Sequence, residues 1–213
     1  MASRIIHLAV AKEIMKSEAI ADSGRFLLGS IIPDAKVDSA LRAAPHYQTV
    51  FPSGLITYEL GRFRREYGNK MATDELYLAY YLHLIQDMVY RRYMYALPHW
   101  DARMPENIVK LHSDYRKINR YIIESRALVN SIALPGDFCL EEIVRRFDFD
   151  MERFMSELQG DFEKVQEGNY HFFNPQMADE YITLATDACL RELDAMRKGQ
   201  PLCDEYAMAW GKE

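Results

Sequence analysis

The amino-acid sequence predicts an all-α fold, a single-domain multi-helix bundle over residues 1–213. Apolar residues recur along most of the chain at the three- and four-residue spacing of a helix face, whereas the alternation typical of strands is scarce. The sequence contains no internal repeat, no low-complexity run and no linker between domains. With 213 residues, 49% of them hydrophobic and 27% charged, the chain is large enough to bury a core of its own.

The first third of the chain is predicted to contain helical segments and one long loop. Residues 5–14 carry apolar side chains at helical spacing, and a short apolar segment follows at 24–29. Two prolines oppose regular structure over residues 34–52, which we therefore expect to be a loop. Residues 53–66 are predicted to be helical again.

The strongest predicted helix covers residues 73–96. Thr73 is the expected N-cap because acidic residues follow it at the positive end of the helix, and Pro98 ends the segment. The tail over residues 200–213 is expected to be loosely ordered, since a glycine and a proline close the last helix. The remaining predicted helices are 105–130, 139–147, 150–166 and 175–198.

Charge and cysteine content exclude several classes of protein. The net charge of −6 argues against a protein that binds a nucleic acid duplex through its backbone. No stretch approaches the roughly 20 apolar residues of a transmembrane helix, and no secretory leader is visible. The three cysteines form no close pair, which favours a reducing compartment and argues against a cysteine zinc site. We therefore expect a cytoplasmic protein.

His83 and Asp87 are the first candidates for chemistry, because they lie four residues apart on the strongest predicted helix. This spacing places an imidazole and a carboxylate on one face, where both can bind one metal ion. The surrounding residues are apolar, and a buried unpaired carboxylate costs several kcal/mol, so a positive group must face Asp87. Pairing of Asp87 with His83, or with Arg91 one turn later, is the alternative to a metal ion.

Three further candidates precede this helix. His7 lies in an apolar helix, where it is either a core residue or a ligand. Asp34 follows Gly29-Ser30-Ile31-Ile32-Pro33 and is either a turn residue or a ligand. His46 lies in the long loop and is either exposed or a ligand. Three imidazoles and two carboxylates without a thiolate suit zinc or a similar divalent ion in the core of a helical bundle.

The order and spacing of these motifs resemble the zinc-dependent phospholipase C family and, more remotely, the zinc single-strand nucleases of the same helical fold. The resemblance covers residues 5 to 87, and the Gly-x-x-x-Pro-Asp turn and the helical His-x-x-x-Asp are its most specific parts. It implies that Asp87 bridges two zinc ions, the second of which also binds His7. The ligands that it implies for the first ion are Asp34, His46, His83 and Asp87.

The resemblance also implies that the amino nitrogen of a mature N-terminal residue completes the second ion. If Met1 is removed, Ala2 lies five positions before His7, as in the zinc nucleases. The family's third ion is expected to be absent here, because no histidine follows closely after Asp87. Arg91, on the same helix face as Asp87, is expected to supply positive charge there, unless it is solvated or paired with an aspartate. His99, His112 and His171 are expected to be surface or loop residues.

The candidate ligands predict a metal-dependent hydrolase of phosphoric esters, and the resemblance implies zinc and a small phosphoester or phospholipid-like substrate. Asp34 is expected to orient or deprotonate the attacking water, and Arg91 to bind a phosphoryl oxygen. A metal-binding or structural helical protein without turnover is the alternative, and the missing third site favours it. A histidine–aspartate phosphohydrolase of another helical fold is disfavoured, because the sequence has no adjacent His-Asp pair.

Overall fold

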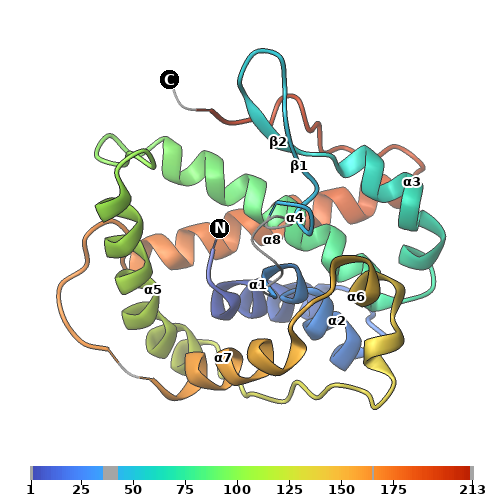
Figure 1. Cartoon of the computed structure of the whole chain (residues 1–213), viewed down its shortest axis with the longest axis horizontal. Coiled ribbons are helices and arrows are strands. Elements are labelled where there is room, and N and C mark those ends of the chain that lie inside the picture. The colour runs from blue at the N-terminus through green and yellow to red at the C-terminus, as the bar shows by residue number, and fades with distance from the viewer. Residues whose placement is uncertain (1, 36–42, 165, 212–213) are drawn as a thin grey trace.

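The computed structural model of the chain describes residues 2–35, 43–164 and 166–211. Over these residues the structure is mostly helical, which confirms the predicted all-α class (Figure 1). No helix in these ranges is both long enough and apolar enough to cross a bilayer. The eight α-helices are α1 (Arg4–Ser17), α2 (Ser23–Gly29), α3 (Leu60–Met71), α4 (Glu75–Tyr95), α5 (Pro105–Ser125), α6 (Glu142–Phe147), α7 (Met151–Glu163) and α8 (Pro175–Arg197).

Helix α4 is the centre of the bundle. It packs against α2, α3 and α8, and it carries buried residues on every side, as its apolar sequence requires (Figure 1). Its N-cap is Asp74 and not the predicted Thr73, because the Asp74 carboxylate accepts the Leu76 N–H at 2.9 Å. The same carboxylate pairs with Arg25 of α2, so the cap also joins the two helices.

Helix α1 brings the start of the chain into the interior. Ser3 caps it by accepting the N–H of Ile6 at 3.4 Å, and the helix packs against α2, α5 and α8. Ala2, the residue just before the cap, is itself buried. One turn into the helix lies His7, which is fully buried. The start of the chain therefore lies beside α4 in the core.

A β-hairpin replaces part of the predicted loop and helix. Strands β1 (Gln48–Val50) and β2 (Ile56–Tyr58) pair antiparallel, so the helix predicted over 53–66 begins only at Leu60. Gly54 adopts a φ of +84° in the turn, a conformation that glycine tolerates without strain. The β2 strand gains a second partner in Trp210, whose N–H and C=O both bond Ile56. That distant partner explains why local periodicity did not predict the strand.

Later helix ends also differ from the predictions. The positive φ of 47° at Ala127 stops α5 at Ser125, before the predicted end at residue 130. The predicted helix over 139–147 divides into a 3₁₀ turn, η3 (Phe138–Leu140), and α6.

The C-terminal segment after α8 is bound to the body of the protein over the residues described. Glu192 of α8 accepts the N–H groups of Leu202 and Cys203 at 2.8 and 2.7 Å. The Glu205 carbonyl accepts the hydroxyl of Thr57 at 2.6 Å. These bonds and the Trp210 bridge fix residues 202–210 against the hairpin, whereas residues 212 and 213 of the predicted loose tail lie outside the described ranges.

Glu66 of α3 anchors the segment that leads into the hairpin. Its carboxylate accepts the Tyr47 hydroxyl at 2.7 Å and pairs with Arg146 of α6 at 2.7 Å and with Arg62 at 3.0 Å. Burial alone would raise the pKa of Glu66, but these partners lower it to about 2. Tyr47 adopts a positive φ of 53°, so Glu66 holds a strained residue next to His46 in place.

The pKa of Glu66 predicts part of the acid sensitivity of the fold. A carboxyl whose pKa is lower in the folded state stabilises the protein above its unfolded pKa and loses that contribution as the pH falls toward its folded pKa. With 28% of the side chain exposed, we expect roughly 2 kcal/mol to be lost between about pH 4.5 and 2. Urea unfolding should therefore show a steeper loss of stability in this window for the wild type than for Glu66→Gln. The exposed Glu167→Gln should follow the wild type, and parallel curves for Glu66→Gln and wild type would refute the assignment.

Candidate metal centre

The structure brings together all five residues that the sequence predicted as ligands. His7 projects from α1, Asp34 ends the 3₁₀ turn η1 (Ile32–Asp34), His46 lies before β1, and His83 and Asp87 lie on α4. Ligand atoms of His7, His83 and Asp87 lie within 4.8 Å of one another, as do those of Asp34, His46 and His83. The two groups share His83, so the five side chains form one cluster.

The first group of donor atoms surrounds one point between η1 and α4. The Nε2 atoms of His46 and His83 are 3.3 Å apart. His46 Nε2 lies 3.5 Å from Asp34 Oδ1 and 3.5 Å from Asp87 Oδ2, and His83 Nε2 lies 3.8 Å from the same Asp87 oxygen. Four donors from three segments therefore face one another.

Asp87 extends the cluster toward α1 with its other oxygen. Asp87 Oδ1 lies 3.4 Å from His7 Nε2 and 3.2 Å from the backbone nitrogen of Ala2. Asp34 also faces both sides, since its Oδ2 lies 4.0 Å from His7 Nε2. The two oxygens of Asp87 thus point to different sets of nitrogen donors, as the oxygens of a bridging carboxylate do.

The separations between donors match those of metal ligands. Zinc ligands at 2.0–2.2 Å in a tetrahedron lie about 3.3–3.6 Å from one another. The contacts of the Asp87 carboxylate and of the paired imidazoles run from 3.2 to 3.8 Å. They are longer than most hydrogen bonds but close enough for a cation between the donors. The residues present therefore fit a divalent metal ion.

Two unpartnered atoms support the same conclusion. His7 Nε2 and Asp34 Oδ1 are buried and have no hydrogen-bond partner among the residues that the structure describes. Buried polar atoms of this kind are rare in folded proteins and call for a ligand, water or ion. The carboxylates of Asp34 and Asp87 also place two negative charges beside the neutral ring of His83, and a divalent cation between the donors would neutralise them.

The outer nitrogens of two histidines are held by hydrogen bonds. His83 Nδ1 lies 2.8 Å from the Ser30 carbonyl, which can only accept, so Nδ1 carries the proton and Nε2 presents its lone pair. His7 Nδ1 lies 2.8 Å from Oε1 of Gln86. Partners of this kind orient ligating imidazoles in metal proteins. Gln86 and the Ser30 carbonyl therefore prepare both rings to bind a cation through Nε2.

The Gly-Ser-Ile-Ile-Pro-Asp turn owes its glycine to close helix packing. A Cβ atom on Gly29 would lie 2.2 Å from the carbonyl oxygen of Leu76 on α4, so no larger residue fits. This approach brings the next residue, Ser30, within bonding distance of His83. Asp34 follows at the end of η1 and faces the same helix.

His46 is buried and not exposed, although it lies outside regular structure. The carbonyl of Pro45 accepts the hydroxyl of Tyr80 on α4 at 2.6 Å, and Tyr47 is fixed by Glu66. Both neighbours of His46 are therefore fixed by residues of α4 and α3. These long-range bonds exclude the exposed position that the sequence left open for His46.

The cluster changes the protonation of its members. Burial and the neighbouring His7 lower the pKa of His83 to about 3, so its ring is neutral. Burial alone would raise the pKa of Asp34, but the imidazoles of His83 and His46 lower it to about 2. Asp34 is therefore a carboxylate, and His83 is in the neutral form that metal ions require.

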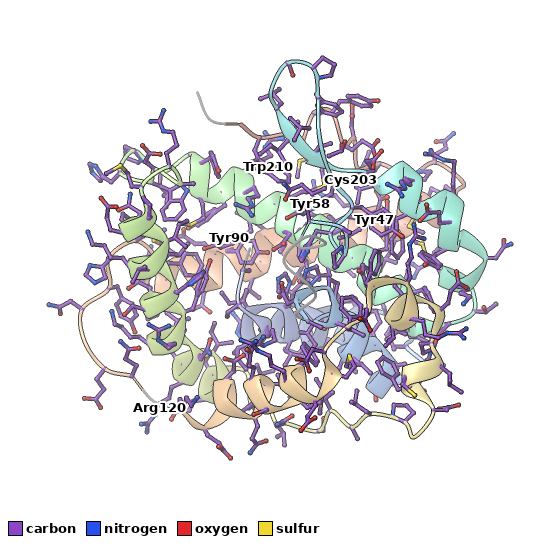
Figure 2. All side chains as sticks on the ribbon, viewed as in Figure 1. Tyr47, Tyr58, Tyr90, Arg120, Cys203 and Trp210 are labelled. Atoms are coloured by element: carbon purple, nitrogen blue, oxygen red, sulfur yellow. The ribbon has the colours of Figure 1, made fainter. Side chains whose placement is uncertain are left out.

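Arg91 and Tyr58 complete the surroundings of Asp87. Tyr58 on β2 donates its hydroxyl to Asp87 Oδ2 at 3.3 Å. The Arg91 guanidinium forms no ion pair with Asp87 but lies over the ring of Trp210, 5.4 Å from its centroid. Its buried Nε has no acceptor among the described residues. The sequence did not predict Tyr58 and Trp210 as neighbours of Asp87 and Arg91. Only the hairpin and the bridge between Ile56 and Trp210 bring these two aromatic residues to the site (Figure 2).

The positions expected for a third ion hold other residues. His99, His112 and His171 are exposed, as the sequence indicated. Asp114 is buried, but its carboxylate accepts the backbone N–H groups of residues 171–173 and pairs with Lys117 at 3.3 Å. Asp114 therefore has a structural role, and the described residues offer no third set of ligands beside Asp87.

Comparisons with known proteins assign no function to the site. No protein-family model, no curated protein and no solved structure matches this chain. The donor atoms, their spacing and their burial are therefore the features that indicate metal binding.

His83 shares both groups of donors, so its removal tests the centre directly. We expect His83→Ala to lose at least one equivalent of bound zinc, with affinity reduced on the order of 100-fold or more. Elemental analysis of the purified chain after dialysis measures the loss, and circular dichroism confirms that the helices persist. The exposed His99→Ala is the matched control and should keep the full metal content. Full zinc occupancy in His83→Ala would show that the cluster is not a metal site.

Proposed function

We propose that the cluster binds two zinc ions and that the protein hydrolyses phosphoric esters. The observation that carries this proposal is the position of Asp87, whose two oxygens lie between separate sets of nitrogen donors. Asp34 Oδ1, His46, His83 and Asp87 Oδ2 would hold the first ion, and Asp87 Oδ1 and His7 the second. Another divalent ion with the same preference for nitrogen and oxygen ligands would also fit.

Paired divalent ions lower the pKa of bound water and offset charge on a phosphoryl group, which is the chemistry that such a centre supplies. Asp34 is the more exposed of the two carboxylates in the cluster, with 9% of its side chain accessible and none of the Asp87 side chain. With Oδ1 assigned to the first ion, the second oxygen of this carboxylate, Oδ2, which lies 4.0 Å from His7 Nε2, can orient a water molecule or take its proton. The substrate class, a small phosphoester or a phospholipid-like phosphodiester, comes from the family resemblance.

Arg91 has a complementary role in this proposal. Its guanidinium lies near Asp87 and Tyr58, both of which raise the pKa of Arg91 against the opposing effect of burial. The Arg91 guanidinium therefore stays charged near Asp87, where the described residues offer no third set of metal ligands. A phosphoryl oxygen would be a suitable acceptor for its unpartnered Nε.

Hydrolysis of bis(p-nitrophenyl) phosphate by the zinc-loaded protein tests the proposed activity. We expect Asp34→Asn to lower kcat by roughly 100-fold, because the amide neither takes a proton nor binds a cation as a carboxylate does. The exposed Asp194→Asn of α8 should retain wild-type activity. Release of nitrophenol at the same rate by Asp34→Asn and wild type would rule out the role of Asp34.

The position of Ala2 leads to a separate proposal for the second ion. Its backbone nitrogen lies 3.2 Å from Asp87 Oδ1, so removal of Met1, whose own structure lies outside the described residues, would place a free amine there. The small side chain of Ala2 favours such removal. The fold would then resemble the zinc-dependent phospholipase C type in this respect as well.

Intact mass and metal content test the role of the Ala2 amine. We expect the purified chain to begin at Ala2, and a version with an uncleaved N-terminal extension to bind one zinc ion fewer because its Ala2 nitrogen is an amide. The His7 and Asp87 side chains are unchanged in both forms. Two zinc ions in the extended form would exclude the amine as a ligand.

A metal-binding protein without turnover is the second candidate. It is favoured by the burial of the cluster, in which even Asp34 is only 9% exposed, and by the structural role of Asp114. The nitrophenyl phosphate assay separates the two candidates when it is combined with elemental analysis. Two bound zinc ions without hydrolysis of this ester or of a phospholipid would favour the binding protein.

A further inference from the structure

A pocket of about 680 Å³ lies at the end of α4, outside the metal centre. Four segments line it: the hairpin turn, the last turn of α4, the loop that follows, and the C-terminal segment. None of the five clustered residues is among the described residues that line it. Its volume is within the range of pockets that bind small molecules, which is about 300–1,000 Å³.

The pocket is more positive than the chain as a whole. Arg92 and Arg103 line it, and Asp101 is its one carboxylate among the described residues. Asp101 pairs with Arg103 at 2.8 Å. Arg92 pairs with no carboxylate in the part of the chain that the structure describes, and its Nη1 lies 3.4 Å from the Ala207 carbonyl and 3.3 Å from Met208 Sδ. No carboxylate of the described residues therefore neutralises the Arg92 guanidinium, although the chain as a whole has a net charge of −6.

The walls of the pocket are aromatic and firmly held. Both tryptophans of the chain, Trp100 and Trp210, line it together with Tyr95. Trp100 packs edge-on against Phe172 with ring centroids 5.3 Å apart. Trp210 is fixed through its two backbone bonds to β2 and packs edge-on against Tyr58 at 4.9 Å. Rigid rings of this kind bind planar groups at low entropic cost.

Trp210 also separates the pocket from the metal centre. Its indole contacts Tyr58 and the Arg91 guanidinium, at 4.9 and 5.4 Å between centres, and Tyr58 donates its hydroxyl to Asp87. The pocket and the cluster are therefore neighbours with one layer of side chains between them. A ligand in the pocket would not contact the metal ligands.

We propose that this pocket, which we call the Trp210 pocket (Arg92, Tyr95, Trp100, Arg103 and Trp210), binds a small planar organic anion. The aromatic part of the anion packs against the half-buried rings of Trp100 and Tyr95, since Trp210 is only 6% exposed, and its phosphoryl or carboxyl oxygens accept hydrogen bonds from Arg92. Arg103 also lines the pocket and remains paired with Asp101. The site is independent of the proposed hydrolase activity.

Phenylphosphonate is a suitable probe, because it joins an aromatic ring to an oxyanion and resists hydrolysis. Both tryptophans of the chain lie in the pocket, so their fluorescence reports binding without a label. We expect a saturable change in emission from the full chain, and a Kd that is roughly tenfold weaker in Arg92→Gln because one charge-assisted contact is lost. Arg92 is exposed, so this substitution leaves the core intact.

The matched control is Arg120→Gln, an exposed arginine of α5 far from Trp210 (Figure 2). It should bind phenylphosphonate as the wild type does, and equal weakening by both substitutions would overturn the proposal. Inorganic phosphate and benzyl alcohol should each bind at least tenfold more weakly than phenylphosphonate, because each lacks one half of the recognised group. Equal affinity for either of them would also overturn it.

The His83→Ala chain separates the pocket from the metal centre. We expect phenylphosphonate to change its tryptophan emission with the wild-type Kd. Loss of binding in this chain, with its helices intact by circular dichroism, would assign the anion to the metal centre and refute the Trp210 pocket. If that chain does not fold, the comparison of Arg92→Gln with Arg120→Gln still decides the question.

Discussion

The carboxylate of Asp87 sets the main physical constraint on this structure. It is fully buried at the centre of α4, where an uncompensated charge costs several kcal/mol. Its neighbours are donors of hydrogen bonds and imidazole nitrogens, and Arg91 forms no ion pair with it. A cation shared with His7, His46 and His83 would satisfy this constraint, and the fold brings those groups together around the carboxylate.

Several segments that are far apart in the chain contribute a member of the cluster or a contact that holds a member. Close packing at Gly29 brings the C-terminal end of α2 against α4. The Ser30 carbonyl then lies 2.8 Å from His83 Nδ1 and accepts its hydrogen bond. The Tyr47 hydroxyl, held by Glu66, fixes the residue next to His46. The C-terminal segment packs Trp210 against Tyr58, so the far end of the chain supports the carboxylate from the opposite side.

Most helices and the five clustered residues could be predicted from the sequence, because both depend largely on short spacings. The interval between His83 and Asp87 fixes their common face, and the Gly-x-x-x-Pro-Asp turn marks Asp34. The burial of His46 and the contact of Tyr58 with Asp87 depend on pairing between segments far apart in the chain. The hairpin escaped prediction for the same reason, since β2 is completed by Trp210, which lies more than 150 residues later.

Anomalous diffraction at the zinc absorption edge, from crystals grown with zinc, tests the central claim most directly. We expect two peaks about 3.5–4 Å apart, one on each side of the Asp87 carboxylate, with His83 and His46 nearest to one and His7 nearest to the other. A cluster without any peak, in crystals whose zinc lies only on surface residues, would contradict the account.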